Sequence, residues 1–174
     1  GDPPPYADME EAESSYTVTG GEISIVEKRW ASWEASRPYY RFPSLGHMYS
    51  MASQYIFGHM NHAGKTMGLA PYGDVRSFPE PFVQICADGL EIDTTWYLRL
   101  PPRSTQPAEL DRTCRDLAAR VQADLEVAVL HLCRVLHERT GHPNLCVTGG
   151  VGLNSVVNGK ILRETPFERL YVAP

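Results

Sequence analysis

The stretch that decides the fold is N-L-C-V-T-G-G-V-G-L-N-S-V-V-N-G-K-I-L, residues 144–162, which L-Y-V follows at 170–172. It predicts a short apolar strand, a glycine-rich turn, a helix over about 153–163 and a second strand. A strand, a helix and a strand in this order usually form a parallel pair joined by a crossover. The sequence therefore indicates an α/β fold.

The glycine-rich turn is the best candidate for a binding site. Ligands of α/β sheets bind where a strand ends and a helix begins, because free N–H groups and the helix dipole favour anions. Gly149, Gly150 and Gly152 lack a Cβ, so a ligand can approach their backbone closely. Asn154 and Asn158 are four residues apart and would share a helix face, where their amides suit a ribose hydroxyl or a phosphate. The run is neither G-x-G-x-x-G nor a Walker A loop, so a turn that only packs the helix on the strand is an equal alternative.

A second glycine-bounded segment, G-K-T-M-G-L-A-P-Y-G, spans residues 64–73. Lys65 could neutralise a bound anion. The alternative is a tight, irregular connection with a lysine on the surface.

His59 and His62 form an i, i+3 pair that could share a metal ion. Glycines flank this stretch, which resembles a loop, and only His47 and Asp74 are near enough in sequence to add a third ligand. Solvated loop histidines are the more ordinary interpretation, so no metal ligand is assigned in this chain.

The rest of the chain has a coarse pattern of further elements. Residues 14–28 alternate around a glycine pair and predict a β-hairpin. Two prolines mark residues 37–43 as a loop. We further expect a helix over 45–57 capped by Ser44, strands near 82–85 and 90–92, a proline-marked linker at 101–107, and a helix over about 109–139 that Gly141 and Pro143 stop.

Composition limits the class of protein. The 174 residues hold 16 Lys and Arg against 21 Asp and Glu, a net charge of −5, and 43% are hydrophobic. This is enough apolar sequence for a core, and the acidic balance argues against a nucleic-acid partner. No apolar run approaches the length that crosses a membrane, and the first residues are no signal peptide. The four cysteines have no C-x-x-C spacing, which indicates reduced thiols in the core. We therefore expect a cytoplasmic protein.

The charge is uneven along the chain. Residues 1–27 hold seven acids and neither Lys nor Arg. We interpret residues 1–13 as an acidic, flexible and solvated N-terminal segment.

Three runs, S-L-G-H-M-Y-S (44–50) and those at 64–73 and 144–162, resemble the NodU/CmcH-type O-carbamoyltransferases. These enzymes carbamoylate nodulation factors, cephalosporins, aminoglycosides and other natural products. The runs occur in the family's order and at comparable spacing. The segment L-A-A-R-V-Q-A-D-L-E (117–126) also resembles the family's sequence between the second and third runs.

The resemblance implies an architecture and a reaction. Family members have a Kae1/TsaD-like domain of actin/Hsp70/sugar-kinase (ASKHA) architecture, followed by a YrdC-like domain. The YrdC-like domain makes carbamoyladenylate from carbamoyl phosphate and ATP, and the Kae1-like domain passes the carbamoyl group to a hydroxyl of a small-molecule natural product. Residues 1–174 would be a single partial domain, one lobe of the Kae1-like domain with a mixed sheet and helices.

The resemblance also implies site residues. Gly149, Gly150, Val151 and Asn154 match the family's nucleotide-contacting Gly-Gly-Val-x-x-Asn run, and the segment from Lys65 to Gly73 would form a wall of the same cleft. The expected nucleotide-binding residues are Gly149, Gly150, Val151, Gly152, Asn154, Asn158, Lys65 and Gly68. Gly152 and Val157 stand where the family usually has Ala.

The family's divalent-metal motifs are not among these residues. Its histidine pair is expected upstream of residue 1 and its aspartate downstream of residue 174, together with the first lobe and the YrdC-like domain. No catalytic residue is assigned, and we expect the segment alone to be inactive.

Two other functions stay open at this point. A tRNA-modifying relative that makes threonylcarbamoyl-adenosine should carry a basic surface, which the acid excess opposes. A non-catalytic module would bind an adenine nucleotide and leave carbamoyl phosphate untouched.

Overall fold

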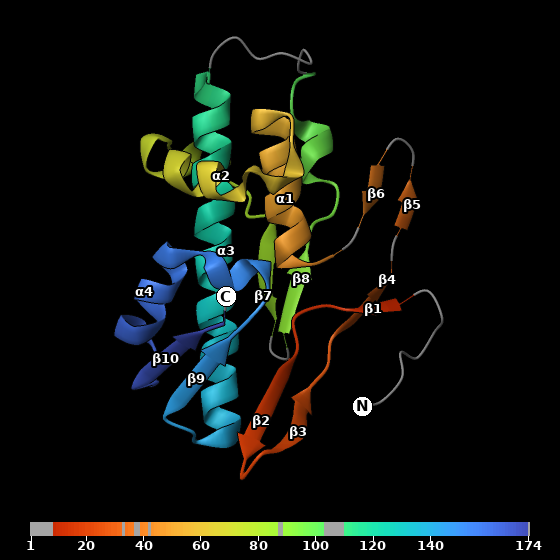
Figure 1. Cartoon of the computed structure of the whole chain (residues 1–174). Coiled ribbons are helices and arrows are strands. Elements are labelled where there is room, and N and C mark those ends of the chain that lie inside the picture. The colour runs from red at the N-terminus through yellow and green to blue at the C-terminus, as the bar shows by residue number, and fades with distance from the viewer. Residues whose placement is uncertain are drawn as a thin grey trace.

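The computed structural model describes residues 9–32, 34–36, 39–41, 43–86, 89–102 and 110–173. It has the α/β fold that the sequence predicts. Helices α1 (Leu45–Phe57), α2 (Ala63–Leu69) and α4 (Ser155–Glu164) lie against the long helix α3 (Arg112–Thr140), and small sheets lie along its lower half (Figure 1).

Helix α3 organises the core. Its 29 residues make it about 43 Å long, and one stripe of its surface is almost fully buried. The stripe consists of Leu117, Ala118, Val121, Leu125 and Ala128, each at most 1% exposed. The Asp111 side chain accepts a hydrogen bond from the N–H of Cys114 at 2.9 Å and caps the helix. The helix thus begins three residues later than predicted, although residues 103–109 lie outside the described part of the chain.

Helix α1 has the predicted bounds. Ser44 Oγ accepts a hydrogen bond from the N–H of His47 at 3.1 Å, and Gly58 ends the helix with a left-handed φ of 75°. Leu45, Met48 and Ile56 are buried against the core. The predicted cap and apolar stripe are therefore both confirmed.

The hairpin β2 (Ser15–Thr19) and β3 (Glu22–Glu27) is antiparallel and turns at the glycine pair, as predicted. Its register sets Tyr16 opposite Ile25 and Val18 opposite Ile23, so these four side chains share one face. All four are exposed, from 38% for Tyr16 to 71% for Ile23.

Three further antiparallel pairs complete this part of the chain. Strands β7 (Val83–Cys86) and β8 (Gly89–Ile92) confirm the expected strands, and β1 (Met9–Glu11) pairs with β4 (Trp30–Ser32). Strand β5 (Glu34–Ser36) pairs with β6 (Tyr39–Arg41). The expectation of a loop over 37–43 is therefore wrong for 39–41, while 37, 38 and 42 lie outside the described residues.

The predicted parallel unit is confirmed. Strand β9 (Asn144–Val147) pairs in parallel with β10 (Arg169–Val172), with Leu145 opposite Leu170, and α4 connects them. The helix starts at Ser155 rather than 153, because a 3-10 helix, η5 (Gly150–Leu153), comes first.

Part of the acidic N-terminal segment is bound to the core. Residues 1–8 lie outside the described residues. Glu11 pairs with Lys28 at 2.9 Å, and Glu13 bonds Arg29 and accepts the N–H of Leu45 at 2.6 Å. These two carboxylates hold the start of α1 and β4, a role that the interpretation as a solvated segment did not include.

Among the described residues, none of the helices is long and apolar enough to cross a lipid bilayer.

Candidate functional site

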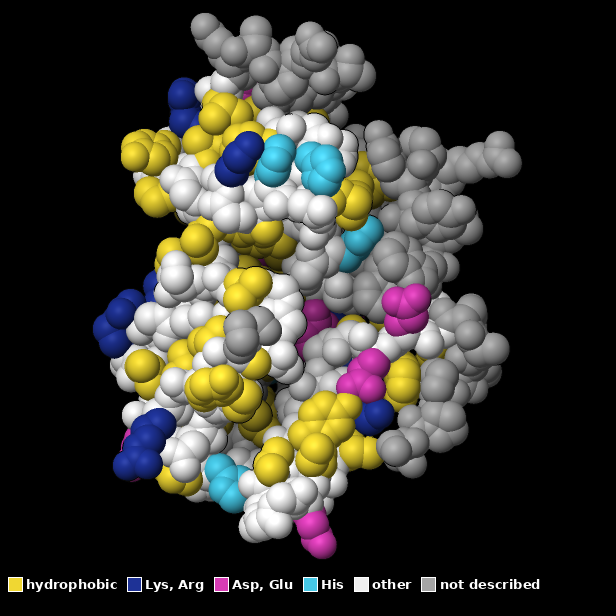
Figure 2. Space-filling model, viewed as in Figure 1, with side chains coloured by type: hydrophobic (Ala, Val, Ile, Leu, Met, Phe, Trp, Pro, Cys, Tyr) yellow, Lys and Arg dark blue, Asp and Glu magenta, His cyan; other side chains and the backbone are white. Residues whose placement is uncertain are grey.

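The segment 64–73 and helix α4 face each other across a groove of about 220 Å³, with α3 as its floor. Figure 2 shows hydrophobic side chains gathered over α2 and over α4 on this side of the molecule. The groove is lined by Met67, Ala70 and Pro71, by Ala119, Gln122, Ala123 and Glu126 of α3, and by Val156 of α4. Ser155 Oγ lies 3.7 Å from Met67 Sδ, so the second and third runs of the sequence meet here.

The segment 64–73 is helical and not the irregular connection that was the alternative. It forms α2 and the 3-10 helix η2 (Ala70–Tyr72), where Pro71 stands in the first turn and its missing N–H costs no hydrogen bond. Thr66 is fully buried and its hydroxyl bonds Ser53 Oγ of α1 at 2.8 Å. This bond fixes α2 on α1 and presents Met67 to the groove.

Lys65 and Gly68 do not line the groove. The Lys65 ammonium lies 3.4 Å from His62 Nε2 and 5.8 Å from the centre of the Phe57 ring. Gly68 is exposed, and apart from its chain neighbours no described atom lies within 4 Å of a Cβ built on it. Their neighbours Met67, Ala70 and Pro71 line the groove, so the role of this segment as a wall of a nucleotide cleft stays a prediction.

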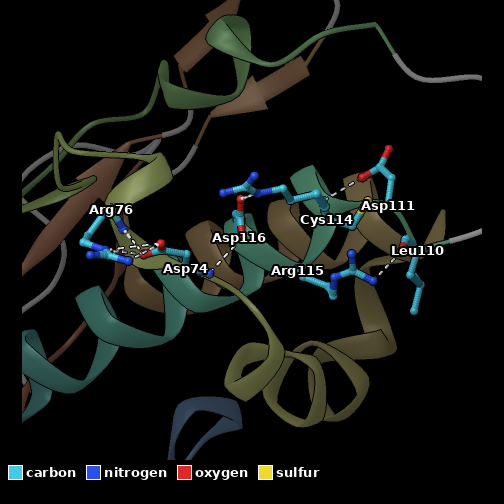
Figure 3. A network of polar contacts seen from close by, with 8 residues as sticks. Asp74, Arg76, Leu110, Asp111, Cys114, Arg115 and Asp116 are labelled. Atoms are coloured by element: carbon cyan, nitrogen blue, oxygen red, sulfur yellow. Dashed lines mark hydrogen bonds and ion pairs between the residues drawn. The ribbon is translucent and has the colours of Figure 1, made fainter.

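This wall is joined to α3 at the level of the backbone. A Cβ built on Gly73 would lie 2.8 Å from the N atom of Asp116 and closer still to the carbonyl of Arg115, so only glycine fits there. The next N–H, that of Asp74, donates to Asp116 Oδ1 at 2.8 Å (Figure 3). The groove therefore has one wall whose distance from its floor is fixed.

The two carboxylates at this junction, Asp74 and Asp116, have lowered pKa values. Burial alone would raise the pKa of Asp116, but the Asp74 N–H, Ser77 and Arg112 outweigh it and lower the pKa. Hydrogen bonds from Arg76 lower the pKa of the Asp74 carboxyl to about 2 (Figure 3). Both carboxylates are thus charged at neutral pH.

The glycine-rich turn leads directly into α4, but the predicted binding residues of the turn and of α4 are not among those that line the groove. Gly149 has a φ of 85°, which other residues rarely adopt, and the N–H of Gly152 donates to its carbonyl at 3.0 Å. The first N–H groups of a helix have no partner within it, and here they belong to Gly150 and Val151 of η5 and to Ser155 and Val156 of α4, while the N–H of Val157 donates to Asn154 Oδ1. Chain neighbours aside, no described atom lies within 4 Å of a Cβ built on Gly150, so this backbone is open to a ligand.

Asn154 and Asn158 hold the turn together. Asn154 is the N-cap of α4 and 7% exposed: its Oδ1 accepts the N–H of Val157 at 3.1 Å and its Nδ2 donates to Gln122 Oε1 at 2.9 Å. Asn158 Nδ2 donates to the carbonyl of Gly152 at 2.7 Å. Both amides are engaged inside the turn, so a direct contact with a nucleotide stays a prediction for them. Gly152 is buried, and a Cβ there would lie 3.0 Å from Val147 Cγ1.

A polar chain runs along the floor of the groove. Tyr49 of α1 donates to Gln122 Oε1 at 2.8 Å, Gln122 Nε2 donates to Glu126 Oε1 at 2.9 Å, and Glu126 Oε2 accepts Lys160 Nζ at 2.6 Å. Burial raises the pKa of Tyr49 far above its usual value, and the hydrogen bond that Lys160 donates to Glu126 raises the pKa of Lys160. Sequence reasoning missed Gln122 and Glu126, although two polar residues four apart beside an apolar stripe could have indicated them.

His59 and His62, the candidate metal pair, lie next to each other. His59 Nδ1 accepts the N–H of Asn61 at 3.1 Å, and its ring centre lies 5.4 Å from that of His62. Desolvation, with the nearby Lys65 and His59, lowers the pKa of His62. Within the described ranges, no group of three or more His, Cys, Asp or Glu side chains could hold a metal ion.

The structure describes all four cysteines, and none forms a disulfide. Cys114 and Cys133 are buried, as expected of core thiols, and burial raises the pKa of Cys133 to about 11. Cys86 is half-buried and Cys146 is exposed, so the expectation of a core thiol is wrong for Cys146.

The second half of the chain has a recognisable sequence profile. Residues 101–174, which include α3, the glycine-rich turn and α4, match the family described as carbamoyltransferase N-terminus. The chain thus carries part of a carbamoyltransferase N-terminus domain. The resemblance to carbamoyltransferases is confirmed.

Relatives extend this relationship over most of the chain. The chain is 33% identical over 168 residues to the uncharacterized protein sll1178 of Synechocystis, covering 82% of this chain and 26% of that protein. It is 34% identical to nodulation protein NolNO of Sinorhizobium fredii (79% of this chain, 22% of that protein) and 32% identical to nodulation protein NolO of Bradyrhizobium diazoefficiens (75% and 25%). The chain spans about a quarter of the length of these relatives.

Proposed function

We propose that this chain is the part of a carbamoyltransferase that holds a carbamoyladenylate while its carbamoyl group moves to a hydroxyl of a small-molecule natural product. The observation that carries the proposal is that the segment 64–73 and the start of α4, which directly follows the glycine-rich turn, face each other across one groove. The family relationship supports carbamoyl transfer as the general reaction.

The groove and the turn suit the two ends of an adenylate. Apolar side chains on both walls suit a flat base, as in most small-molecule sites. The backbone N–H groups of Gly150, Val151 and the start of α4, with the positive end of the helix dipole, suit a phosphate. The phosphate would thus lie at the turn and the base between α2 and α4.

This placement defines the contribution of the chain to the transfer step. The acceptor oxygen forms a bond to the carbamoyl carbon, the bond from that carbon to the phosphate oxygen breaks, and AMP leaves with its electron pair. N–H groups at the turn would stabilise the charge that develops on the leaving phosphate. The hydroxyl proton passes to a general base, which we expect outside residues 1–174.

We further propose that the chain is one lobe of an ASKHA, Kae1-like domain. The parallel pair β9–β10 and the position of the turn at the end of β9 support this assignment. The other lobe and a YrdC-like domain would supply the remaining contacts and make the adenylate. The described residues do not fit the divalent metal that the resemblance implies, and no step here uses it.

The proposal is tested on the full natural polypeptide that contains these residues. It is incubated with carbamoyl phosphate, ATP and two acceptors, an aminoglycoside and a nodulation-factor oligosaccharide, and products are identified by mass spectrometry. We expect a carbamoylated acceptor from the wild type and none from Gly150→Val, whose side chain would cover the open backbone and whose Cβ meets no described atom within 4 Å outside its chain neighbours and its own helix.

The matched control is Gly64→Val, which also projects into open space among the described residues but lies outside the groove lining. It should retain transfer. Equal activity of Gly150→Val and wild type, or the absence of any carbamoylated product, would contradict the proposal. Residues 1–174 alone should show no turnover of carbamoyl phosphate and ATP.

A further inference from the structure

The floor of the groove carries one acidic side chain, Glu126, whose hydrogen-bonding capacity is only half used. Its side chain is 16% exposed and lines the groove. One oxygen accepts Gln122 Nε2 at 2.9 Å and the other accepts Lys160 Nζ at 2.6 Å. An ionised carboxylate has about four acceptor positions, so about two remain for a ligand.

The orientation of this carboxylate is fixed from both sides. Gln122 is itself held by Tyr49 at 2.8 Å and by Asn154 at 2.9 Å, and is only 5% exposed. Lys160 supplies one positive charge next to Glu126, so a cationic ligand gains little from a pair that is already neutral overall. Two neutral hydroxyl groups on adjacent carbons match the two remaining acceptor positions better.

We propose that Glu126 selects a ribonucleotide by accepting hydrogen bonds from the vicinal 2′- and 3′-hydroxyls of its ribose. This inference rests on the proposed function, because it takes the groove to hold an adenylate. The apolar walls formed by Met67, Ala70, Pro71 and Val156 enclose the base, and the start of α4 receives the phosphate. Glu126 then lies beside the ribose, whose hydroxyl groups are the hydrogen-bond donors. Gln122 is the positioning residue that orients the carboxylate of Glu126.

The test compares nucleotides that differ in a single hydroxyl. Calorimetric titration of the full natural polypeptide with ATP, 2′-deoxy-ATP and 3′-deoxy-ATP gives the ratio of affinities. A lost hydrogen bond to a charged acceptor should weaken binding of each deoxynucleotide about tenfold or more. Glu126→Gln, which keeps the shape but has a single neutral acceptor oxygen, should reduce that ratio several-fold.

Glu138→Gln is the matched control, since Glu138 is exposed on the same helix and does not line the groove. It should keep the ratio of the wild type. If Glu126→Gln fails to fold, the ratio of the wild type's affinities for ATP and for each deoxynucleotide still tests the inference. Equal affinity of the wild type for ATP and both deoxynucleotides overturns the inference, as does an unchanged ratio in a folded Glu126→Gln.

The two proposals fail differently. A polypeptide that transfers carbamoyl groups but does not discriminate ribose overturns only the role of Glu126. Weaker binding of the hydroxylated acceptor to Glu126→Gln, with no ribose preference in the wild type, assigns the groove to the acceptor and also overturns that role. A polypeptide that binds none of the three nucleotides overturns both proposals.

Discussion

Replacing Gly73 by alanine tests how the wall of the groove is joined to its floor. The new Cβ would lie 2.8 Å from the N atom of Asp116 and closer still to the Arg115 carbonyl, whereas real Cβ atoms essentially never come within 3.0 Å of another heavy atom. Both neighbours belong to the backbone of α3 and cannot rotate away. Either α3 or the end of η2 must therefore shift.

The cost follows from two terms. Overpacking of this kind destabilises a protein by about 1–3 kcal/mol. The same shift stretches the hydrogen bond from the Asp74 N–H to Asp116, and a hydrogen bond to a charged group contributes about 1.5–3 kcal/mol. Allowing for partial relaxation, we expect Gly73→Ala to lower the free energy of unfolding by about 3 kcal/mol. At about 2–4 °C per kcal/mol for a chain of this size, Tm should fall by about 6–12 °C.

Thermal melting followed by circular dichroism, and urea unfolding followed by fluorescence of the buried Trp96, measure this change. The control is Gly68→Ala, where the added methyl meets open space among the described residues and alanine favours the helix by about 0.5–1 kcal/mol. Its Tm should stay or rise. A Gly73→Ala protein with the wild-type Tm would refute the close approach and the geometry of the groove.

Three further outcomes are expected. Asn154→Ala removes the N-cap of α4 and the hydrogen bonds between Asn154 and Gln122, so urea denaturation should show a loss of about 1–2 kcal/mol. A loss smaller than that of Asn158→Ala would contradict the cap. The pKa of Asp74 is lowered from 3.8 to about 2, so the stability that its charged form contributes is present above pH 3.8 and is lost as the pH falls toward 2. In Asp74→Asn, Tm should therefore fall less steeply over this pH interval. A dependence of Tm on acid pH equal to that of the wild type would argue against the pair with Arg76. A thiol reagent should modify Cys146 in the native protein well before Cys114 or Cys133, and peptide mass spectrometry measures the extent of modification at each cysteine. Rapid modification of Cys114 in the native protein would show that the core is not packed as described.

Local signals explain which elements could be predicted. Helix α1 has a cap at each end, Ser44 and Gly58, and an apolar stripe between them, so its bounds are encoded within 15 residues of sequence. The parallel unit around the glycine-rich turn is equally local. The segment 64–73 was harder to assign, because its glycines and proline disfavour a helix while burial of Thr66 against Ser53 stabilises one.

The floor of the groove could not be predicted in the same way. Gln122 and Glu126 contribute to it only because α3 packs between α2 and α4, and that register depends on contacts between residues far apart in the sequence. Lys65 shows the converse case. Its charge suggested an anion contact, but the helical turn of α2 directs it toward His62 and Phe57.

The two walls of the groove are attached to α3 in different ways, and this determines how the width of the groove can change. The wall that ends at Gly73 contacts α3 through main-chain atoms, so the distance between this wall and α3 can hardly change. The wall formed by α4 is held by polar side chains, Asn154 on Gln122 and Lys160 on Glu126, whose hydrogen bonds can lengthen or be exchanged for water. Any widening that admits a bulky molecule is thus a displacement of α4, and it carries the glycine-rich turn with it.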